Sequence, residues 1–221
     1  MSAAVPALAR AIRRAGTTLL VTASVAAAQT TPIGDALIAR GGLDSFFSFT
    51  LVSGYTVPNA LLGQRLASVS VFGSANNVGR SFIPLLVSMP SVNSTSFSIL
   101  GIGTTRTVQT GIVDYDFGLV SGTDVFQAGT RFAWFNPGFG AIEFNGDNDG
   151  IRFAFTDNQS PAPTLGATRQ TNSISPEDRA YSIRFNVTNP NATVVPEPST
   201  YALLASGLGA LMVVARRRRS A

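Results

Sequence analysis

The chain has 221 residues, 16 basic against 12 acidic side chains and a formal net charge of +4. It holds no cysteine and no histidine, which excludes disulfides, Ser-His-Asp and Cys-His nucleophilic sites and the usual zinc ligands. Every basic residue is an arginine, so Schiff-base chemistry on a lysine is excluded as well.

The basic charge is concentrated at the two ends of the chain. Residues 29–195 keep nine arginines against eleven acidic residues, a net charge of about −2. Arginines at the two ends are explained by orientation in a membrane. We therefore expect no nucleic acid among the partners of this protein.

The first 28 residues are predicted to be a helical signal peptide. Arg10, Arg13 and Arg14 form a basic n-region, and residues 15–25 form an apolar core. The small side chains of Ala26 and Ala28 supply an A-x-A cleavage site, so residues 1–28 are expected to be removed. The general secretion machinery and signal peptidase are the partners that this segment predicts.

Residues 29–188 are predicted to form one all-β domain. Short runs of period-two alternation, bounded by Gly, Pro and Asn, are typical of strands. No ten-residue helical stripe interrupts them, which excludes the βαβ plan of a parallel sheet. The predicted fold is an antiparallel β-sandwich, jelly-roll-like in character. Its expected strands are 45–52, 66–72, 80–88, 94–102, 104–110, 111–120, 130–136, 141–145, 151–156 and 181–188.

Three local features of this domain are predicted from sequence. The odd-numbered positions of 181–187 are apolar and alternate with polar residues, so they are expected to face the core. Pro84 cannot donate a ladder hydrogen bond, so its strand is expected at a sheet edge or a bulge. Residues 158–175 are rich in Ser, Thr, Pro and Asn and are expected to form a long surface loop.

The segment from Asn145 to Gly150 has two interpretations. Asn145, Asp147 and Asp149 place oxygen side chains at positions one, three and five of a calcium loop, with glycine at position six. Position twelve is Thr156 where a helix-flanked loop requires glutamate, so that identification fails. A hairpin turn, which Asn-Asp-Gly favours, and a structural calcium site on the surface remain as the alternatives.

The aromatic run around Trp134 also has two interpretations. Phe132 and Trp134 share one face of an expected strand, and Ala133 and Phe135 share the other. Exposed rings would stack on sugars, with Trp134 as the stacking residue. Apolar residues on both faces instead favour a central strand packed on both sides, or one whose second face is covered by a loop.

No catalytic residue is assigned. Asp114 and Asp116 share one strand face opposite apolar neighbours, which is typical of solvent-facing acids. A glycosidase would need two carboxyl groups about 5 to 9.5 Å apart across a cleft. Glu143 and Asp147 are the other acids weighed for such a pair. We expect a protein that is not an enzyme and that holds no cofactor, apart from the calcium considered above.

The carboxyl end has three consecutive parts: a tether at 189–198, an apolar run at 199–215 and a basic tail at 216–221. The prolines of the tether favour an extended chain. The apolar run has 17 residues, which at about 1.5 Å per residue spans roughly 25 Å, the short end of a transmembrane helix. The tail contains four consecutive arginines, Arg216, Arg217, Arg218 and Arg219, which are costly in hydrocarbon and are expected to stay cytoplasmic.

These parts resemble the PEP-CTERM sorting domain of Gram-negative bacteria, in which a Pro-Glu-Pro motif, a transmembrane stretch and an arginine-rich tail are recognised by the membrane enzyme exosortase. The matching motif is Val195, Pro196, Glu197 and Pro198. The resemblance implies export, temporary anchoring in the inner membrane with the β domain outside the cytoplasm, and cleavage near the motif. The protein would then reach the cell surface or the extracellular matrix.

Three functions are therefore considered for the β domain. The first is a structural or adhesive role in an exported surface or matrix protein linked to exopolysaccharide and biofilm. The second is a lectin-like module that binds carbohydrate, with or without a stabilising calcium ion. The third is a secreted glycoside hydrolase that works through carboxylates.

Overall fold

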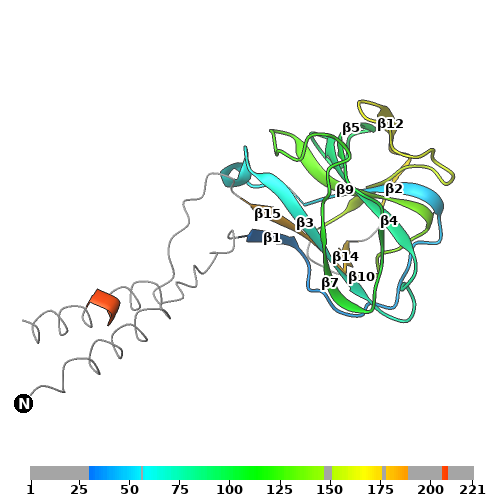
Figure 1. Ribbon diagram of the computed structural model, residues 1–221. Helices are drawn as coiled ribbons and strands as arrows, with labels where there is room; N and C mark the ends of the chain where they lie inside the picture. Colours follow the sequence, from blue (N-terminus) through cyan, green and yellow to red (C-terminus); the bar gives the residue numbers. More distant parts are fainter. Residues whose placement is uncertain (1–29, 56, 147–150, 176–177, 189–205, 209–221) are drawn as a thin grey trace, which may run out of the picture. The chain divides into compact units, whose positions relative to one another are not determined.

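The computed structural model describes residues 30–55, 57–146, 151–175, 178–188 and 206–208 (Figure 1). The strands in these residues are β1 (Thr30–Gly34), β2 (Phe47–Ser53), β3 (Arg65–Gly73), β4 (Ser81–Ser88), β5 (Ser96–Ile102), β6 (Arg106–Thr107), β7 (Gly111–Asp116), β8 (Ser121–Gly122), β9 (Thr130–Phe139), β10 (Phe144–Gly146), β11 (Phe153–Phe155), β12 (Thr168–Gln170), β13 (Ser173–Ile174), β14 (Arg179–Tyr181) and β15 (Ile183–Thr188). A short 3-10 helix, η1, spans Asn59–Leu61.

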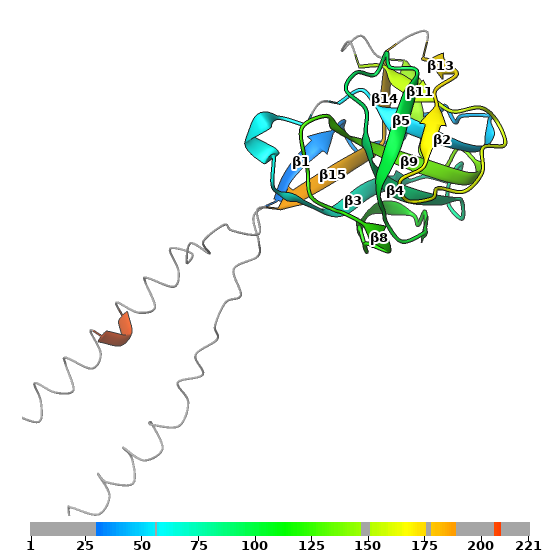
Figure 2. The ribbon, with the colours of Figure 1, turned by 90° about the horizontal axis from the view of Figure 1, so that it is seen from above.

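The strands pair antiparallel throughout the described chain. A four-stranded sheet has the order β1-β15-β3-β7, and a nine-stranded sheet has the order β12-β5-β4-β9-β2-β11-β13 with β6 and β8 attached. Strands β10 and β14 form a separate two-stranded sheet. Figure 2 shows β1, β15 and β3 of the smaller sheet side by side. The prediction of an all-β, antiparallel domain is therefore confirmed.

The four-stranded and nine-stranded sheets share the larger of the two hydrophobic cores of the described residues. Leu66, Val69 and Phe185 enter it from the four-stranded sheet, and Phe132 and Trp134 enter it from the nine-stranded sheet. The rings of Phe132 and Phe185 stack across the interface with centroids 4.3 Å apart. Burial of these large apolar side chains is the main force that holds the sheets together.

The nine-stranded sheet curls until its two edges meet. The strands at the two ends of its order, β12 and β13, are joined by only two residues. The N–H of Thr171 donates to the carbonyl oxygen of Thr95 beside β5, while the next N–H, that of Asn172, donates to the carbonyl oxygen of Phe155 in β11. Residues 168–174 therefore form a seam that hydrogen-bonds both edges of the sheet.

Strand β9 lies in the middle of this curled sheet, between β4 and β2. Phe132 and Trp134 belong to the larger core, whereas Ala133 and Phe135 belong to the second core. The second core also contains Val52, Leu85, Val87, Met89, Phe97, Ile99 and Ala154. The interpretation of this run as a central strand packed on both sides is confirmed.

The predicted alternation along residues 181–187 is also confirmed. Tyr181, Ile183, Phe185 and Val187 are all buried in the larger core. The run is nevertheless split into β14 and β15 at Ser182, whose N–H donates to the carbonyl oxygen of Glu143.

The placement of Pro84 at a sheet edge is wrong, because β4 lies between β5 and β9. The physical reason is local. On the side away from β9, β5 pairs only as far as Leu85 and β6 pairs only with Ser81 and Phe82. Pro84 lies opposite the gap between these two partners, where its carbonyl oxygen accepts a hydrogen bond from the N–H of Gly103. The N–H that Pro84 lacks would point into this gap, so its absence breaks no hydrogen bond between paired strands.

Other differences from the sequence prediction concern short strands and their ends. Strand β1 was not predicted, and β12 and β13 lie within residues 158–175, which were expected to be a loop. Strand β7 ends at Asp116 instead of Val120, and Gly118 follows with a φ of 56°.

The signal peptide (1–28), the tether (189–198) and the tail (216–221) lie outside the described residues, as does the predicted transmembrane helix (199–215) apart from 206–208. Residues 206–208 are helical. Among the residues that the structure describes, there is no helix of the length and hydropathy that a membrane crossing requires.

Candidate functional site

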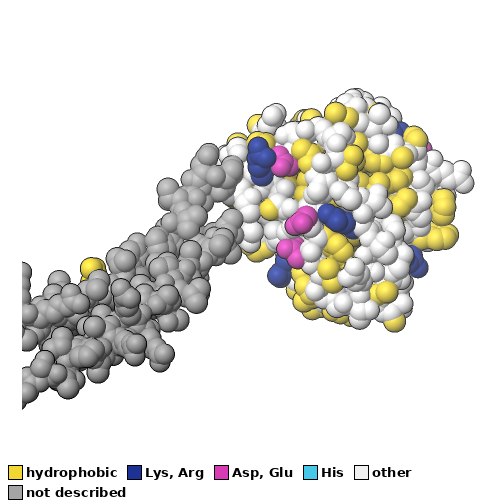
Figure 3. Space-filling model, viewed as in Figure 1, with side chains coloured by type: hydrophobic (Ala, Val, Ile, Leu, Met, Phe, Trp, Pro, Cys, Tyr) yellow, Lys and Arg dark blue, Asp and Glu magenta, His cyan; other side chains and the backbone are white. Residues whose placement is uncertain are grey.

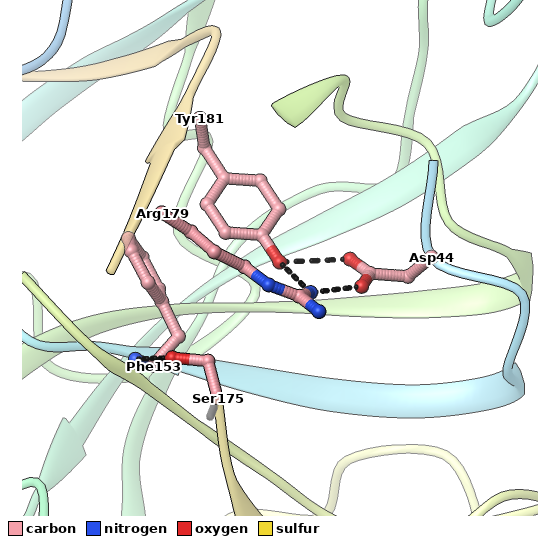
Figure 4. Close-up of polar contacts among 5 residues, drawn as sticks. All are labelled: Asp44, Phe153, Ser175, Arg179 and Tyr181. Atoms are coloured by element: carbon pink, nitrogen blue, oxygen red, sulfur yellow. Dashed lines mark hydrogen bonds and ion pairs between the residues drawn. The ribbon is translucent and has the colours of Figure 1, made fainter. Parts of the chain in front are cut away.

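A buried ionic cluster joins the segment before β2 to β14 (Figure 4). Nη1 of Arg179 lies 2.7 Å from Oδ1 of Asp44, and the hydroxyl of Tyr181 donates to Oδ2 of Asp44 at 2.9 Å. The guanidinium also lies over the ring of Phe144, 4.1 Å from its centroid. Both oxygens of the carboxylate are thus used by partners within the protein.

Burial shifts the proton affinities in this cluster. It raises the pKa of Asp44 above its ordinary value, although the nearby charge of Arg179 and the hydrogen bonds from Tyr181 and Arg179 act in the opposite direction. Burial also raises the pKa of Tyr181 well above the usual value of 10.0, with the Asp44 charge adding to the effect. These contacts tie the carboxylate into the fold, which gives the cluster a structural role.

Glu143 is a fully buried carboxylate in the loop between β9 and β10. Its Oε2 accepts a hydrogen bond from the backbone N–H of Arg40 at 2.7 Å. Its Oε1 accepts hydrogen bonds from the hydroxyl of Ser74 and from Nδ2 of Asn76. A carboxylate enclosed by donors of two separate segments, one at Arg40 and one at residues 74–76, holds those segments together and presents no free oxygen to a substrate.

Asp114 lies exposed on the outer face of the four-stranded sheet, as predicted. Its Oδ1 accepts hydrogen bonds from the hydroxyl of Ser70 and from Nδ2 of Asn186, both at 3.0 Å. The same Asn186 amide also lies 3.0 Å from the hydroxyl oxygen of Ser68. This polar ladder crosses β7, β3 and β15. Asp116 is exposed on the same strand.

The predicted calcium segment is described only in part. Asn145 lies in β10, and its Oδ1 accepts a hydrogen bond from Nη1 of Arg40. Asp147 and Asp149 lie outside the described residues. Within the described ranges, no three acidic side chains gather at the spacing that a metal ion requires. The oxygen of Asn145 faces a guanidinium, an environment that disfavours a second cation.

Trp134, the predicted sugar-stacking residue, has 0% of its surface exposed. Its ring packs edge to face against Tyr181 and Phe153, with centroids 5.1 and 5.9 Å away. The alternation of β9 turns this ring into the core between the sheets. Neither face of the indole is open to a sugar in this fold, and core packing is its role.

A polar cleft of about 550 Å³ lies where the two edges of the nine-stranded sheet meet. Residues 156–161, which follow β11, line one side, and residues 168–170 with Asn172 line the other. The side chains of Gln159, Gln170 and Asn172 are exposed and form no hydrogen bond within the described chain. The cleft therefore offers amide groups that no part of the fold uses.

Two exposed rings adjoin this cleft. Phe47 is hydrogen-bonded through its backbone to two residues of the lining, with its N–H donating to Oδ1 of Asn158 and its carbonyl oxygen accepting from the N–H of Gln159. Its ring, 47% exposed, packs edge to face against the ring of Phe139, which is 54% exposed, with centroids 5.4 Å apart. Large aromatic side chains this exposed are typical of binding surfaces.

The backbone beside the cleft is strained at two positions. Ser48 has a φ of 55° and Gln159 a φ of 63°, the positive values that non-glycine residues rarely adopt. Ser48 lies at the irregularity in the pairing of β2 with β9, and its hydroxyl donates to the carbonyl oxygen of Ser160 at 2.8 Å. Strain of this kind clusters at functional sites.

Sequence reasoning missed this cleft, the two rings and the cluster around Asp44. Ser, Asn, Gln and Thr in residues 158–175 favour a loop, and nothing in a single sequence shows that such a loop closes a sheet. Phe47 and Phe139 are separated by more than ninety positions, so only the pairing of β2 with β9 brings them together. The available signal was the presence of three phenylalanines, Phe46, Phe47 and Phe49, within four positions.

Charged side chains are few in the lining of the cleft. Figure 3 shows hydrophobic and uncharged polar surface over most of one face of the domain, with charged side chains in small groups. The charged residues of the cleft itself are one acid, Asp157, and one base, Arg169. The charges of the cleft lining therefore balance.

Comparison with known proteins finds a match at the carboxyl end of the chain. Residues 194–219 match the PEP-CTERM protein-sorting motif. This range includes the predicted motif Val195 to Pro198 and the four arginines Arg216 to Arg219. The chain matches no curated protein and no solved structure. The chain is thus a protein with a PEP-CTERM sorting motif, which implies export and exosortase-dependent sorting.

Proposed function

We propose that this protein is a structural or adhesive component of the bacterial surface or extracellular matrix, delivered there by exosortase. The observation that carries the proposal is the match of residues 194–219 to the sorting motif. A precursor of this kind enters by the general secretion route and loses residues 1–28 to signal peptidase. Residues 199–215 then anchor it in the inner membrane, with Arg216 to Arg219 on the cytoplasmic side.

The proposed role of the β domain is non-catalytic. In support, two of the acids weighed for a hydrolase are committed to the fold. Glu143 is enclosed by hydrogen-bond donors, and Asp114 belongs to the polar ladder on the outer sheet face. A domain of about 160 residues with two filled hydrophobic cores suits a protein that must persist outside the cell without disulfides.

The sorting step is tested by locating both ends of the mature protein. The protein is recovered from the envelope and the medium of the producing bacterium, and its termini are determined by mass spectrometry. We expect an amino terminus at Gln29 and loss of the arginine-rich tail. A variant with Pro196→Ala, Glu197→Ala and Pro198→Ala should keep residues 199–221 and stay in the inner membrane. Pro190→Ala, a tether proline outside the motif, is the matched control.

The orientation is tested separately with protease added to intact spheroplasts. The β domain should be digested together with a periplasmic control protein. A β domain that stays intact while the control is digested would contradict export. A motif variant that is processed like the natural chain would contradict recognition by exosortase.

A further inference from the structure

We infer that the cleft at the seam of the nine-stranded sheet binds a segment of an uncharged glycan chain. This inference gives the β domain of the proposed surface protein a ligand class, but binding in solution does not depend on the route by which the protein is sorted. It rests on the chemistry of the lining, the adjoining rings and the strained backbone.

The lining offers the groups that hydroxyl-rich ligands need. A primary amide presents both donors and an acceptor, and the amides of Gln159, Gln170 and Asn172 are unused within the described chain. The hydroxyls of Thr168 and Ser160 already contact protein oxygens but keep acceptor capacity. Sugar hydroxyls act both as donors and as acceptors, so such a surface matches them.

The charges of the cleft favour a neutral ligand over a polyanion. Asp157 would repel a uronate or phosphate group, and it offsets the attraction of Arg169. Arg169 is also engaged, because its Nη2 donates to the carbonyl oxygen of Ala162 at 2.8 Å. A site for an acidic polymer would instead present several cations with unused donors.

The ring pair supplies an apolar contact next to the amides. Phe47 is bound through its backbone to Asn158 and Gln159 of the lining, and its exposed ring packs on that of Phe139. One face of a pyranose ring carries C–H groups that pack on an aromatic ring by dispersion and burial. A chain of two or more sugar units could then span the cleft and the rings together.

The backbone fixes these groups before a ligand arrives. Phe47 lies opposite Phe139 in the register of β2 with β9, next to the irregularity at Ser48. The N–H of Gln159, a residue with positive φ, donates to the carbonyl oxygen of Phe47. The hydroxyl of Ser48 donates a hydrogen bond to the carbonyl oxygen of Ser160, another residue of the lining. A preformed site loses less conformational entropy on binding.

Binding is measured by isothermal titration calorimetry on the full-length chain purified in detergent micelles. The probes are cellohexaose, laminarihexaose, maltohexaose and the extracellular polysaccharide of the producing cells, separated by anion exchange into neutral and acidic fractions. An alginate hexamer serves as the polyanionic probe. We expect saturable binding of a neutral probe that does not weaken as salt is raised, because no ion pair is involved.

Two variants locate the site. Gln170→Ala combined with Asn172→Ala removes amides that the fold does not use, and we expect the affinity to fall about tenfold. Phe139→Ala removes an exposed ring and should lower it by a similar factor. The matched controls are Gln109→Ala with Gln127→Ala for the amides, and Ile112→Ala, an exposed apolar residue of β7, for the ring. The controls should bind like the natural chain.

Several outcomes would overturn the inference. Absence of binding to every neutral probe, including the neutral polysaccharide fraction, would overturn the ligand class, as would binding to alginate alone. Equal affinity of the cleft variants and their controls would overturn the location. None of these results bears on the sorting of the protein, which the processing experiment tests by itself.

Discussion

The hydroxyl of Tyr181 donates a hydrogen bond to Oδ2 of Asp44 at 2.9 Å, although the two residues are 137 positions apart. The hydroxyl oxygen of Tyr181 also lies 3.2 Å from Nη1 of Arg179, which pairs with the other oxygen of the same carboxylate. The three side chains bring the segment before β2 against β14. This closure makes the stability of the domain sensitive to Asp44.

Replacement of Asp44 should separate the contribution of its hydrogen bonds from that of its charge. Asp44→Ala leaves a partly buried guanidinium and a buried hydroxyl without their acceptor, and we expect a loss of about 3 kcal/mol in the free energy of unfolding. Asp44→Asn should cost much less, because the amide keeps an oxygen for Arg179 and burial already favours the neutral form of this side chain. Urea unfolding at pH 7 measures both.

The control for this pair is Asp124→Ala. The carboxylate of Asp124 lies 3.6 Å from Arg65, whose side chain is largely exposed, so its removal should cost less than about 1 kcal/mol. Equal losses in Asp44→Ala and Asp44→Asn would show that the charge, and not the acceptor geometry, stabilises the cluster.

The Tyr181 hydroxyl should make the domain sensitive to alkaline pH. Burial raises the pKa of Tyr181 well above 10.0 in the folded state, so the folded chain holds this proton after the unfolded chain has lost it. The stabilisation is complete below about pH 10 and is lost as the pH rises through the folded pKa. In Tyr181→Phe, the free energy of unfolding should be lower at pH 9 but should fall less between pH 9 and pH 11.

The comparison is made by urea unfolding at both pH values, with Tyr115→Phe as a second variant that loses a buried hydroxyl. The hydroxyl of Tyr115 donates to the carbonyl oxygen of Thr107 and accepts from the N–H of Gln109. If the free energy of unfolding of Tyr181→Phe fell as much between pH 9 and pH 11 as that of the natural chain, the assignment of the alkaline sensitivity to Tyr181 would be refuted.

Glu143 should be required for stability. Glu143→Ala leaves the N–H of Arg40, the hydroxyl of Ser74 and the amide of Asn76 without their acceptor, and we expect a loss of about 2 to 4 kcal/mol. Asp116→Ala, which removes an exposed acid, should change stability by less than about 0.5 kcal/mol. Thermal unfolding followed by circular dichroism compares the two, and similar melting temperatures would contradict the role of Glu143.

The tryptophan fluorescence of the chain reports Trp134 alone, because the sequence has one tryptophan. Its complete burial predicts emission at short wavelength and weak quenching by acrylamide until the protein unfolds. Addition of a neutral glycan that binds the cleft should leave the emission maximum unchanged, since the ring lies in the core. A red-shifted, strongly quenched emission from the folded chain would contradict this placement.

The strands could be predicted from the sequence wherever one face of the sheet is exposed to solvent or both faces are apolar. The alternation at 181–187 and the two apolar faces around Trp134 are local patterns, and both led to correct placements. Strand β1 was missed because Pro32 lies within it and its residues are mostly exposed. Strands β12 and β13 were missed because Ser, Thr and Asn dominate a segment whose strand pairing comes from distant partners.

The candidate sites depend on contacts that a single sequence does not encode locally. The rule that a proline lacks an N–H predicts an edge or a bulge at Pro84, but the gap between β5 and β6 satisfies that rule inside the sheet. Asp44 and Arg179 carry no motif, and their pairing is a consequence of the fold. The sorting motif could be identified without knowledge of the fold, because its residues are contiguous in the sequence and their order alone identifies it.

The seam formed by residues 168–174 limits how copies of this domain could polymerise. A sheet that curls onto itself offers few unpaired backbone groups to a neighbour. Among the described edge strands outside it, β1 and β7, the two edges of the four-stranded sheet, are the longest that intermolecular strand addition could use. Both edge strands disfavour the addition of a strand from another chain. Pro32 in β1 lacks a backbone N–H donor. Asp114 and Asp116 in β7 would bring like charges together if two copies of β7 paired. Chains crowded together outside a cell should therefore remain separate folded units instead of merging into cross-β fibres.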